Sequence, residues 1–305
     1  MLKSKKALGL EISNDGLSFA LAQGGKSLKL DAGLSLALPP GTLQLSRREP
    51  NVLNPHAFVA AVKEAHLRLL TKESTVSVSL PDAVGRVVLL ELEARFKNRE
   101  EGVDIIRWKL KKSLPFDIST VHLDYQLLEE KENGAVSLLV SLISRPVLTQ
   151  YEELLIQAGL EPKYLDFTSF SLYRLFAPRL EMSENGAFVT FYRGAMTVLI
   201  FYGGVLSFYR TKETVGEAQN LYREVNSSFL VYNDRHQGQA VSDAFCMVGD
   251  PAAAEGFRAL VAEASGLEPV LLDLDRLVSP DRAAGLDKPA LYALAGSLGA
   301  ALRSL

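Results

Sequence analysis

The sequence is poor in the residues from which disulfides and zinc sites are made. Its one cysteine, Cys246, cannot form an internal disulfide. The four histidines show no metal-ligand spacing: they are His56, His66, His122 and His236. Zinc chemistry is therefore not expected. Cys246 lies in the apolar run 244–248, so we interpret it as a small buried core residue, with a reactive thiol as the alternative.

Long hydrophobic runs and an excess of charge are also missing. The longest apolar stretches, 135–143 and 198–202, are far shorter than the roughly 20 residues that cross a bilayer. The apolar stretch near the N-terminus ends at Glu11, too early for a secretory signal, so we expect a cytoplasmic protein. A net charge of -3 argues against nucleic-acid binding. The one dense basic cluster is typical of a solvated helix face: Arg107, Lys109, Lys111 and Lys112.

Catalytic motifs of the common classes are absent as well. There is no Gly-x-Ser-x-Gly nucleophile elbow and no lysine-bearing phosphate loop. What the sequence does have is 305 residues, of which 48% are hydrophobic and 23% charged. Such a chain can bury a large core and is long enough for two domains.

Three antiparallel strands are predicted at the start of the chain. The strands 7–12 and 17–23 flank a turn whose Asn and Gly tolerate positive φ, and a third strand follows at 28–38. Asn54 and Pro55 then predict the start of a helix. Its apolar stripe is Phe58, Val62, Ala65 and Leu69.

A middle block, about 73–160, reads strand, strand, helix, strand, strand, helix. Its strands are predicted at 75–80, 86–92, 121–129 and 136–144, and its helices at 99–113 and 146–158. Gly159 is a typical cap for the second helix. A strand at 163–167, a helix at 169–176 and a polar linker at 178–184 are predicted to follow.

The second half of the sequence opens as the first half does. Strands are predicted at 187–192, 197–202 and 205–211, and a helix at about 215–232. This repeated pattern indicates two related halves, which is the layout of an actin-like, or ribonuclease H-like, duplicated fold. We therefore predict an α/β protein with a first domain over 1–180, an α+β subdomain inserted at about 73–160, and a shortened second domain over 186–305.

One long string carries a family resemblance. Residues 106–125 read Ile-Arg-Trp-Lys-Leu-Lys-Lys-Ser-Leu-Pro-Phe-Asp-Ile-Ser-Thr-Val-His-Leu-Asp-Tyr, and shorter matches lie at 9–12, 79–81, 154–162 and 295–303. With these motifs the sequence resembles the PilM family, the cytoplasmic actin-like components of type IV pilus systems. It is more distantly similar to the cytoplasmic part of the GspL proteins of type II secretion.

The resemblance implies a partner. Members of the PilM family bind the N-terminal cytoplasmic tail of the inner-membrane protein PilN, in a groove between the first subdomain and the insertion. The resemblance thus implies a scaffold at the inner face of the inner membrane, which touches the membrane only through this partner and can contact other platform proteins. Candidate tail contacts are Val78, Leu80, Val87, Leu89, Arg107 and Trp108. For Trp108, a packing role within its helix is the favoured alternative.

The resemblance also locates a nucleotide site, whose turns are altered here. An actin-like ATPase needs glycine so that backbone N–H groups reach phosphate, and aspartate to organise Mg²⁺. The matching positions are Glu11, Ser13 and Asp15 in the first turn, Thr190 and Tyr192 in the second, and Gly249 in the adenosine turn. The phenol of Tyr192 and the carboxylate of Asp15 therefore stand where an active site would present only backbone N–H groups. We expect no ATP or Mg²⁺ binding and no catalysis, as in a pseudo-ATPase.

A missing segment supports the same expectation. The strand that ends at 211 is followed within a few residues by the helix from about 215, where family members insert a subdomain that walls the nucleotide cleft. The alternative is an active actin-like ATPase or sugar-kinase relative with unusual phosphate loops. A self-assembling filament protein is a third hypothesis.

Other residues near these turns have ordinary interpretations. Arg193 is interpreted as an exposed turn arginine, with an anion contact as the alternative. Asp166 and Asp250 are interpreted as solvated or capping carboxylates. The Gly296 and Gly299 pair has helical spacing and predicts close packing of a helix against the sheet.

Overall fold

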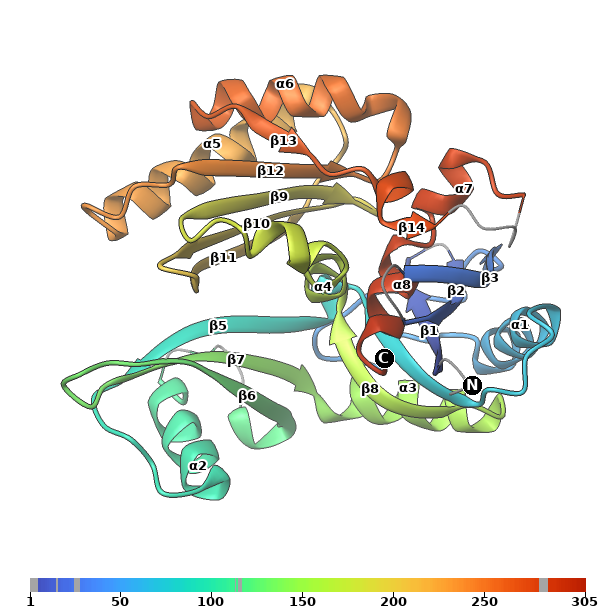
Figure 1. The fold of residues 1–305 in the computed structure, drawn as a ribbon. Coiled ribbons are helices and arrows are strands. Elements are labelled where there is room, and N and C mark those ends of the chain that lie inside the picture. The colour runs from blue at the N-terminus through green and yellow to red at the C-terminus, as the bar shows by residue number, and fades with distance from the viewer. Residues whose placement is uncertain (1–4, 15, 25–27, 113, 115–116, 280–284) are drawn as a thin grey trace.

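The computed structural model describes residues 5–14, 16–24, 28–112, 114, 117–279 and 285–305, and they form three β-sheets (Figure 1). Two sheets make up two similar halves, with helices packed between them and on their outer faces. The third sheet projects from the first half. Within the described residues, no helix is both long and apolar enough to span a membrane.

The first sheet has the strand order β14-β3-β2-β1-β4-β8. Its strands are β1 (Lys6–Ile12), β2 (Gly16–Gln23), β3 (Leu28–Ala37), β4 (Thr75–Leu80), β8 (Glu161–Phe167) and β14 (Val278–Ser279). β1 to β3 are antiparallel, while β4 and β8 run parallel to β1. The predicted opening hairpin is therefore confirmed.

Both faces of this sheet are buried. Leu8 and Leu10 of β1 pack in a core with α1 (Pro55–Arg68) and α3 (Arg145–Gln157). The opposite face meets α4 (Thr168–Leu180) and α8 (Ala295–Leu302), which lie between the two halves. As predicted, Asn54 caps α1: its side chain accepts a hydrogen bond from the backbone N–H of Ala57, 3.1 Å away.

The second sheet repeats this plan with the order β11-β10-β9-β12-β13. Its strands are β9 (Gly186–Tyr192), β10 (Ala195–Tyr202), β11 (Val205–Glu213), β12 (Asp243–Val248) and β13 (Pro269–Leu271). α5 (Ala218–Arg235) and α6 (Ala254–Ser265) cover its outer face, and α7 (Lys288–Tyr292) leads into α8. The order β3-β2-β1-β4 in one half matches β11-β10-β9-β12 in the other, which confirms the predicted duplication. Cys246 is fully buried in β12, as predicted.

The third sheet is antiparallel and consists of β5 (Gly85–Leu92), β7 (Val136–Ser144) and β6 (Val121–Glu130). One of its faces is covered by α2 (Arg99–Leu110). This inserted sheet is smaller than the predicted block 73–160, because β4 pairs with β1 and β8 in the first sheet. The alternation of apolar and polar residues along 75–80 identifies a strand but does not reveal which strands pair with it.

Two predicted boundaries differ from the structure. α4 continues through Pro178 to Leu180, so part of the predicted linker 178–184 is helical. The buried side chain of Leu180 holds this last turn in the core between the two halves. α2 ends at Leu110, and the predicted end of that helix at Ser113 lies outside the described residues, as does the Pro-Phe step after it.

Candidate functional site

The two turns predicted to be altered phosphate loops contact each other directly. The phenol of Tyr192, at the end of β9, donates a hydrogen bond to Glu11 Oε2 of β1 at 2.8 Å. Both residues are buried, with 3% and 1% of their surface exposed. The backbone N–H of Gly296 in α8 donates to the same phenol oxygen at 3.4 Å. One side chain from each half and one helix therefore meet at this point.

Two glycines show how closely this contact is packed. A Cβ atom at Gly249 would lie 2.9 Å from the Tyr192 ring, and one at Gly296 would lie 2.5 Å from the carboxyl group of Glu11. Burial, and next the nearby Glu11 carboxylate, raise the pKa of Tyr192 above its usual value. The phenol therefore stays protonated and continues to act as a donor.

The neighbouring arginine also crosses between the halves. Arg193 has φ of +50° and Gly194 has φ of +76°, as a tight two-residue hairpin turn requires. Arg193 Nη2 donates to Ser18 Oγ and to the backbone carbonyl of Ala293, each at 3.1 Å. The residue is exposed, as interpreted from the sequence, but its guanidinium group ties the second half to the first.

The remaining predicted nucleotide positions are structural neighbours of this contact. Ser13 Oγ donates to the carbonyl of Gly16 at 3.1 Å and closes the first turn. Thr190 is buried within β9. Asp15 lies outside the described residues. The structure therefore brings together Glu11, Tyr192 and Gly249, with Ser13 beside them.

A further link between the halves was not predicted. Tyr209 of β11 donates to Asp82 Oδ1 at 2.8 Å, and the backbone N–H of Ser169 in α4 donates to Asp82 Oδ2 at 3.0 Å. Burial raises the pKa of Asp82, although the hydrogen bonds from Ser169 and Tyr209 lower it in part. Asp82 and Tyr209 are 127 positions apart, so no local pattern indicates the contact.

A cavity of about 600 Å³ lies beside these contacts. It is lined by both turns and by charged side chains that include Arg47, Arg48, Asp82 and Lys212. Lys212 is already paired with Glu224 of α5. Among the described residues, no group of His, Cys, Asp and Glu side chains is arranged to hold a metal ion.

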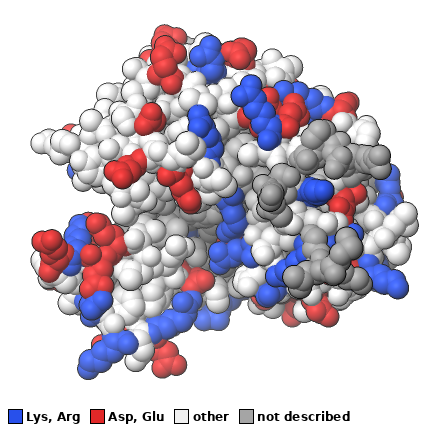
Figure 2. Space-filling view, viewed as in Figure 1, with Lys and Arg blue, Asp and Glu red and all other residues white. Residues whose placement is uncertain are grey.

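A larger groove of about 920 Å³ lies between the inserted sheet and the rest of the molecule. Figure 2 shows a hollow on the left, between the second sheet above and the inserted sheet below, with basic side chains at its inner end. Residues 124–128 of β6 form one wall and residues 163–167 of β8 form another. β6 and β8 are each an edge strand of their sheet among the described residues. Two edge strands therefore line one groove.

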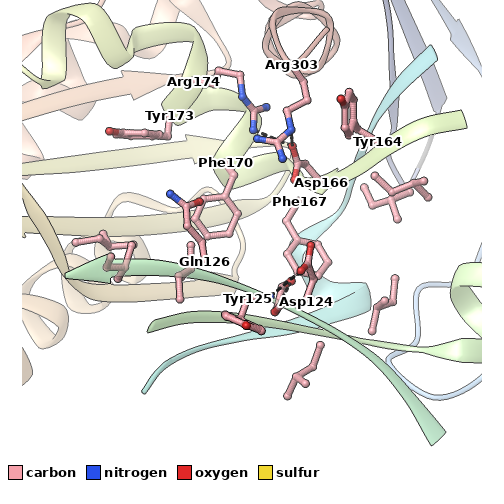
Figure 3. A pocket seen from close by; sticks show the side chains of 18 of the residues that line it. Asp124, Tyr125, Gln126, Tyr164, Asp166, Phe167, Phe170, Tyr173, Arg174 and Arg303 are labelled. Atoms are coloured by element: carbon pink, nitrogen blue, oxygen red, sulfur yellow. Dashed lines mark hydrogen bonds and ion pairs between the residues drawn. The ribbon is translucent and has the colours of Figure 1, made fainter. Parts of the chain in front are cut away.

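The groove has an ionic end and an aromatic wall (Figure 3). Arg174 Nη2 lies 2.8 Å and Arg303 Nε 3.7 Å from Asp166 Oδ2, so this carboxylate is paired rather than merely solvated. The guanidinium group of Arg303 also lies 5.1 Å from the ring centroid of Tyr164. Tyr173 of α4 stacks on Phe201 of β10 at 5.3 Å.

The six predicted tail contacts, all of them described residues, are not brought together. Val78 and Leu80 are buried in the first sheet, and Leu80 alone is among the residues that line the groove. Val87 and Leu89 are half-buried on β5. Arg107 and Trp108 lie on α2, which covers the opposite face of the inserted sheet. The groove residues of β6 and β8 were missed, because their role depends on which strands lie at sheet edges.

Trp108 is not a packing residue, contrary to the favoured interpretation. Its surface is 75% exposed. The buried face of α2 carries Gly102, Ile106 and Leu110. Trp108 is displaced from Ile106 by about 200° around the helix, so helical spacing could have predicted this exposure.

Two duplicated halves and a sheet inserted into the first define the chain as a protein of the actin-like fold. No family model and no curated protein matches the sequence. Among solved structures, a PilM-PilN type IV pilus biogenesis complex is similar with 22% identity, 97% of this chain and 98% of that chain covered, and a TM-score of 0.81.

Two more distant structures have the same fold. One is the cytoplasmic domain of EpsL, an inner-membrane component of the Vibrio cholerae type II secretion system. It has 12% identity and a TM-score of 0.52, and the match covers 95% of this chain and 94% of that chain. The other is a Bacteroides thetaiotaomicron protein with an actin-like ATPase fold. It has 13% identity and a TM-score of 0.52, and the match covers 92% of this chain and 96% of that chain. The predicted fold, and its likeness to PilM and to the secretion protein, are confirmed.

Proposed function

We propose that this protein is a non-catalytic scaffold of a type IV pilus or related type II secretion platform at the inner face of the inner membrane. It binds there the N-terminal cytoplasmic tail of a PilN-like membrane protein. The observation that carries the proposal is the similarity to the PilM-PilN complex over 97% of the chain, together with the groove between β6 and β8. Other platform proteins are candidate further partners.

The groove suits an extended peptide. Consecutive residues of β6 and of β8 line it, together with residues 139 and 141–143 of β7. An edge strand can pair with a peptide strand through main-chain hydrogen bonds, while pockets select alternate side chains. Phe167 and Phe170 provide apolar contacts, and Arg174 and Arg303 provide positive charge near Asp166.

The contact between Glu11 and Tyr192 supports the absence of ATPase activity. The carboxylate that would organise magnesium accepts a hydrogen bond from the phenol, and the ring packs against Gly249 in the turn that would contact adenosine. Arg193 bonds to Ser18 and Ala293 across the same gap. Bound phosphates would have to replace these buried interactions, so the residues present do not fit a magnesium nucleotide.

Calorimetric titration with a synthetic tail peptide tests the groove. Gln126 is exposed on β6 and points into the cavity (Figure 3). Gln126→Tyr adds a bulky ring to the wall of the groove and should weaken peptide binding by about tenfold or more. Gln126→Ala is the matched control and should bind within about twofold of the wild type. Equal affinity of all three proteins would place the tail elsewhere.

The rival function, an ATPase, would use the cavity of about 600 Å³ beside the two turns. Thermal unfolding with and without Mg-ATP separates the two functions. A bound nucleotide well above its Kd raises the midpoint by several degrees, since it stabilises only the folded state. We expect no shift with Mg-ATP and a clear shift with the tail peptide.

A further inference from the structure

The outer side of α2 presents an exposed tryptophan. Trp108 is the only tryptophan in the chain. It is 75% exposed although the rest of the helix is well packed through Ile106 and Leu110. A buried indole ring contributes a large apolar area to an interface, so the side chains around Trp108 decide whether it belongs to a contact surface.

Basic side chains surround this ring. Lys111 and Lys112 follow Trp108 by three and four positions, in the turn that ends α2, and the backbone N–H of Lys111 still donates to the carbonyl of Arg107, so helical spacing brings Lys111 next to Trp108. Both are exposed, and so is Lys109, whose Nζ donates to the backbone carbonyl of Glu91. We call Trp108, Lys109, Lys111 and Lys112 the basic tryptophan face.

Acidic groups near this face are fewer. Asp104 lies one turn before Trp108, and Lys111 is close enough to Asp117 to help lower the pKa of that carboxyl, after the hydrogen bonds from Ser119. The face therefore keeps a positive balance. It lies on the opposite side of the inserted sheet from the groove, at the outer end of the molecule (Figure 1).

The composition of the basic tryptophan face favours a lipid surface over a protein as its binding partner. Lysine is depleted from protein interfaces, and a single aromatic side chain buries far less than the roughly 1,000 Å² that a stable interface needs. Tryptophan with flanking lysines is instead the composition of membrane-water interfaces. The ring there lies at headgroup level, and the lysine stems stay apolar while their ammonium groups reach phosphate.

We propose that the basic tryptophan face binds the anionic headgroup surface of a phospholipid bilayer. The inference goes beyond the proposed function and relies on it only for a location beside a membrane. The contact is weak by itself, but a tail held in the groove raises its effective concentration at the surface. It would orient the inserted sheet against the bilayer, so the partner's tail would not be the sole attachment.

Intrinsic fluorescence tests the proposal at the residue concerned, because the chain has no other tryptophan. Full-length protein is titrated with vesicles of mixed phosphatidylglycerol and phosphatidylethanolamine, without tail peptide. The emission of Trp108 should move to shorter wavelength, should return as salt is added, and should not move with phosphatidylcholine vesicles.

Two double variants distinguish binding by the basic tryptophan face from an effect of overall charge. Lys111→Gln/Lys112→Gln should weaken vesicle binding by about thirtyfold, because each lysine near the surface contributes about fivefold. The control Lys63→Gln/Lys72→Gln removes the same charge from exposed positions on and after α1, at the far side of the molecule (Figure 1), and should keep wild-type binding.

Two results would overturn the proposal. One is unchanged Trp108 emission with anionic vesicles, and the other is an equal loss of binding in both double variants. A shift caused by the tail peptide and not by vesicles would assign the face to the protein partner instead. Because the vesicle titration contains no peptide, its outcome is independent of whether the groove binds the tail.

Discussion

Tyr192 is the residue on which our proposal of a non-catalytic protein most depends. Its ring occupies the space between the two hairpin turns, and its hydroxyl group bonds to the buried carboxylate of Glu11. Sequence comparison of the two turns identified both side chains, because an actin-like site needs small residues there. It could not show that they would bond to each other.

Removing the Tyr192 hydroxyl should destabilise the fold. Tyr192→Phe keeps the ring but leaves the buried Glu11 without this donor, which costs about 1–3 kcal/mol. Denaturant unfolding measures the change. Tyr202→Phe is the control, since the Tyr202 side chain is at the surface of the same sheet, and it should leave stability unchanged. A Tyr192→Phe protein as stable as the control would mean that this bond does not hold the halves together.

Asp82 should make stability depend on pH. Burial raises its pKa in the folded state above the ordinary value of 3.8, so the fold favours the protonated form. Its contribution is complete below 3.8 and is lost as pH rises through the folded pKa. Asp82→Asn does not titrate, so the variant should gain stability relative to wild type over that window. Unfolding at a series of pH values tests this, and a constant difference between the two proteins would contradict it.

At the scale of elements, α8 is held by close backbone contacts. A Cβ at Gly299 would lie 1.9 Å from the carbonyl oxygen of Ser171 in α4, and one at Gly9 would lie 1.9 Å from the carbonyl oxygen of Ser297. The predicted close packing against the sheet is confirmed for Gly296, which lies against Glu11 of β1, whereas Gly299 packs against α4. The helix wedges between both halves because glycine lets the backbones touch.

Two glycine substitutions should therefore have opposite effects. Gly299→Ala forces backbone atoms apart and should cost about 1–3 kcal/mol or more. Gly256→Ala lies on the exposed side of α6 with no atom within 4 Å of the new Cβ, and should stabilise by about 0.5–1 kcal/mol. Thermal unfolding of both variants provides the comparison. A mild effect at Gly299 would show that α8 can move away from α4.

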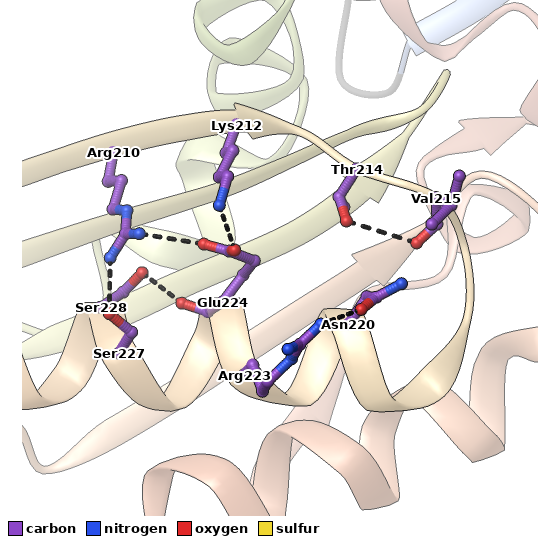
Figure 4. A network of polar contacts seen from close by, with 9 residues as sticks. All are labelled: Arg210, Lys212, Thr214, Val215, Asn220, Arg223, Glu224, Ser227 and Ser228. Carbon is purple, nitrogen blue, oxygen red and sulfur yellow. Dashed lines mark hydrogen bonds and ion pairs between the residues drawn. The ribbon is translucent and has the colours of Figure 1, made fainter.

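The short connection after β11 fixes α5 against the second sheet. Residues 214–217 join the two elements, so no further subdomain lies between them. Glu224 of α5 accepts hydrogen bonds from Arg210 and Lys212 of β11 (Figure 4). The helix thus lies directly on the strand, in the place where the resemblance to PilM implied an insertion.

Local sequence patterns predicted which segments form helices and strands better than they predicted which segments pack or pair with each other. Asn54 and Gly159 marked helix ends correctly, because capping depends on neighbouring residues. The membership of β4 in the first sheet, and the contact between Asp82 and Tyr209, depend on segments far apart in sequence. The sequence did not predict which strands line the groove of about 920 Å³, since sheet order is a property of the whole fold.

At the scale of the molecule, side-chain hydrogen bonds among the described residues join the two halves. Tyr192 with Glu11, Arg193 with Ser18, and Tyr209 with Asp82 each join the second half to the first. Actin-like enzymes depend on a cleft that accepts a nucleotide between their halves. In this molecule hydrogen bonds cross the same region, and the larger groove lies beside the inserted sheet. These contacts support our proposal that the molecule holds a peptide and does not cycle with a nucleotide.

Hydrogen exchange of the full chain, with and without the tail peptide, tests this central claim most directly. The account predicts new protection of backbone amides in β6 and β8, where the groove borders two strand edges, and no change in the turns around Ser13 and Arg193. Protection confined to those turns, or absent from β6 and β8, would contradict it.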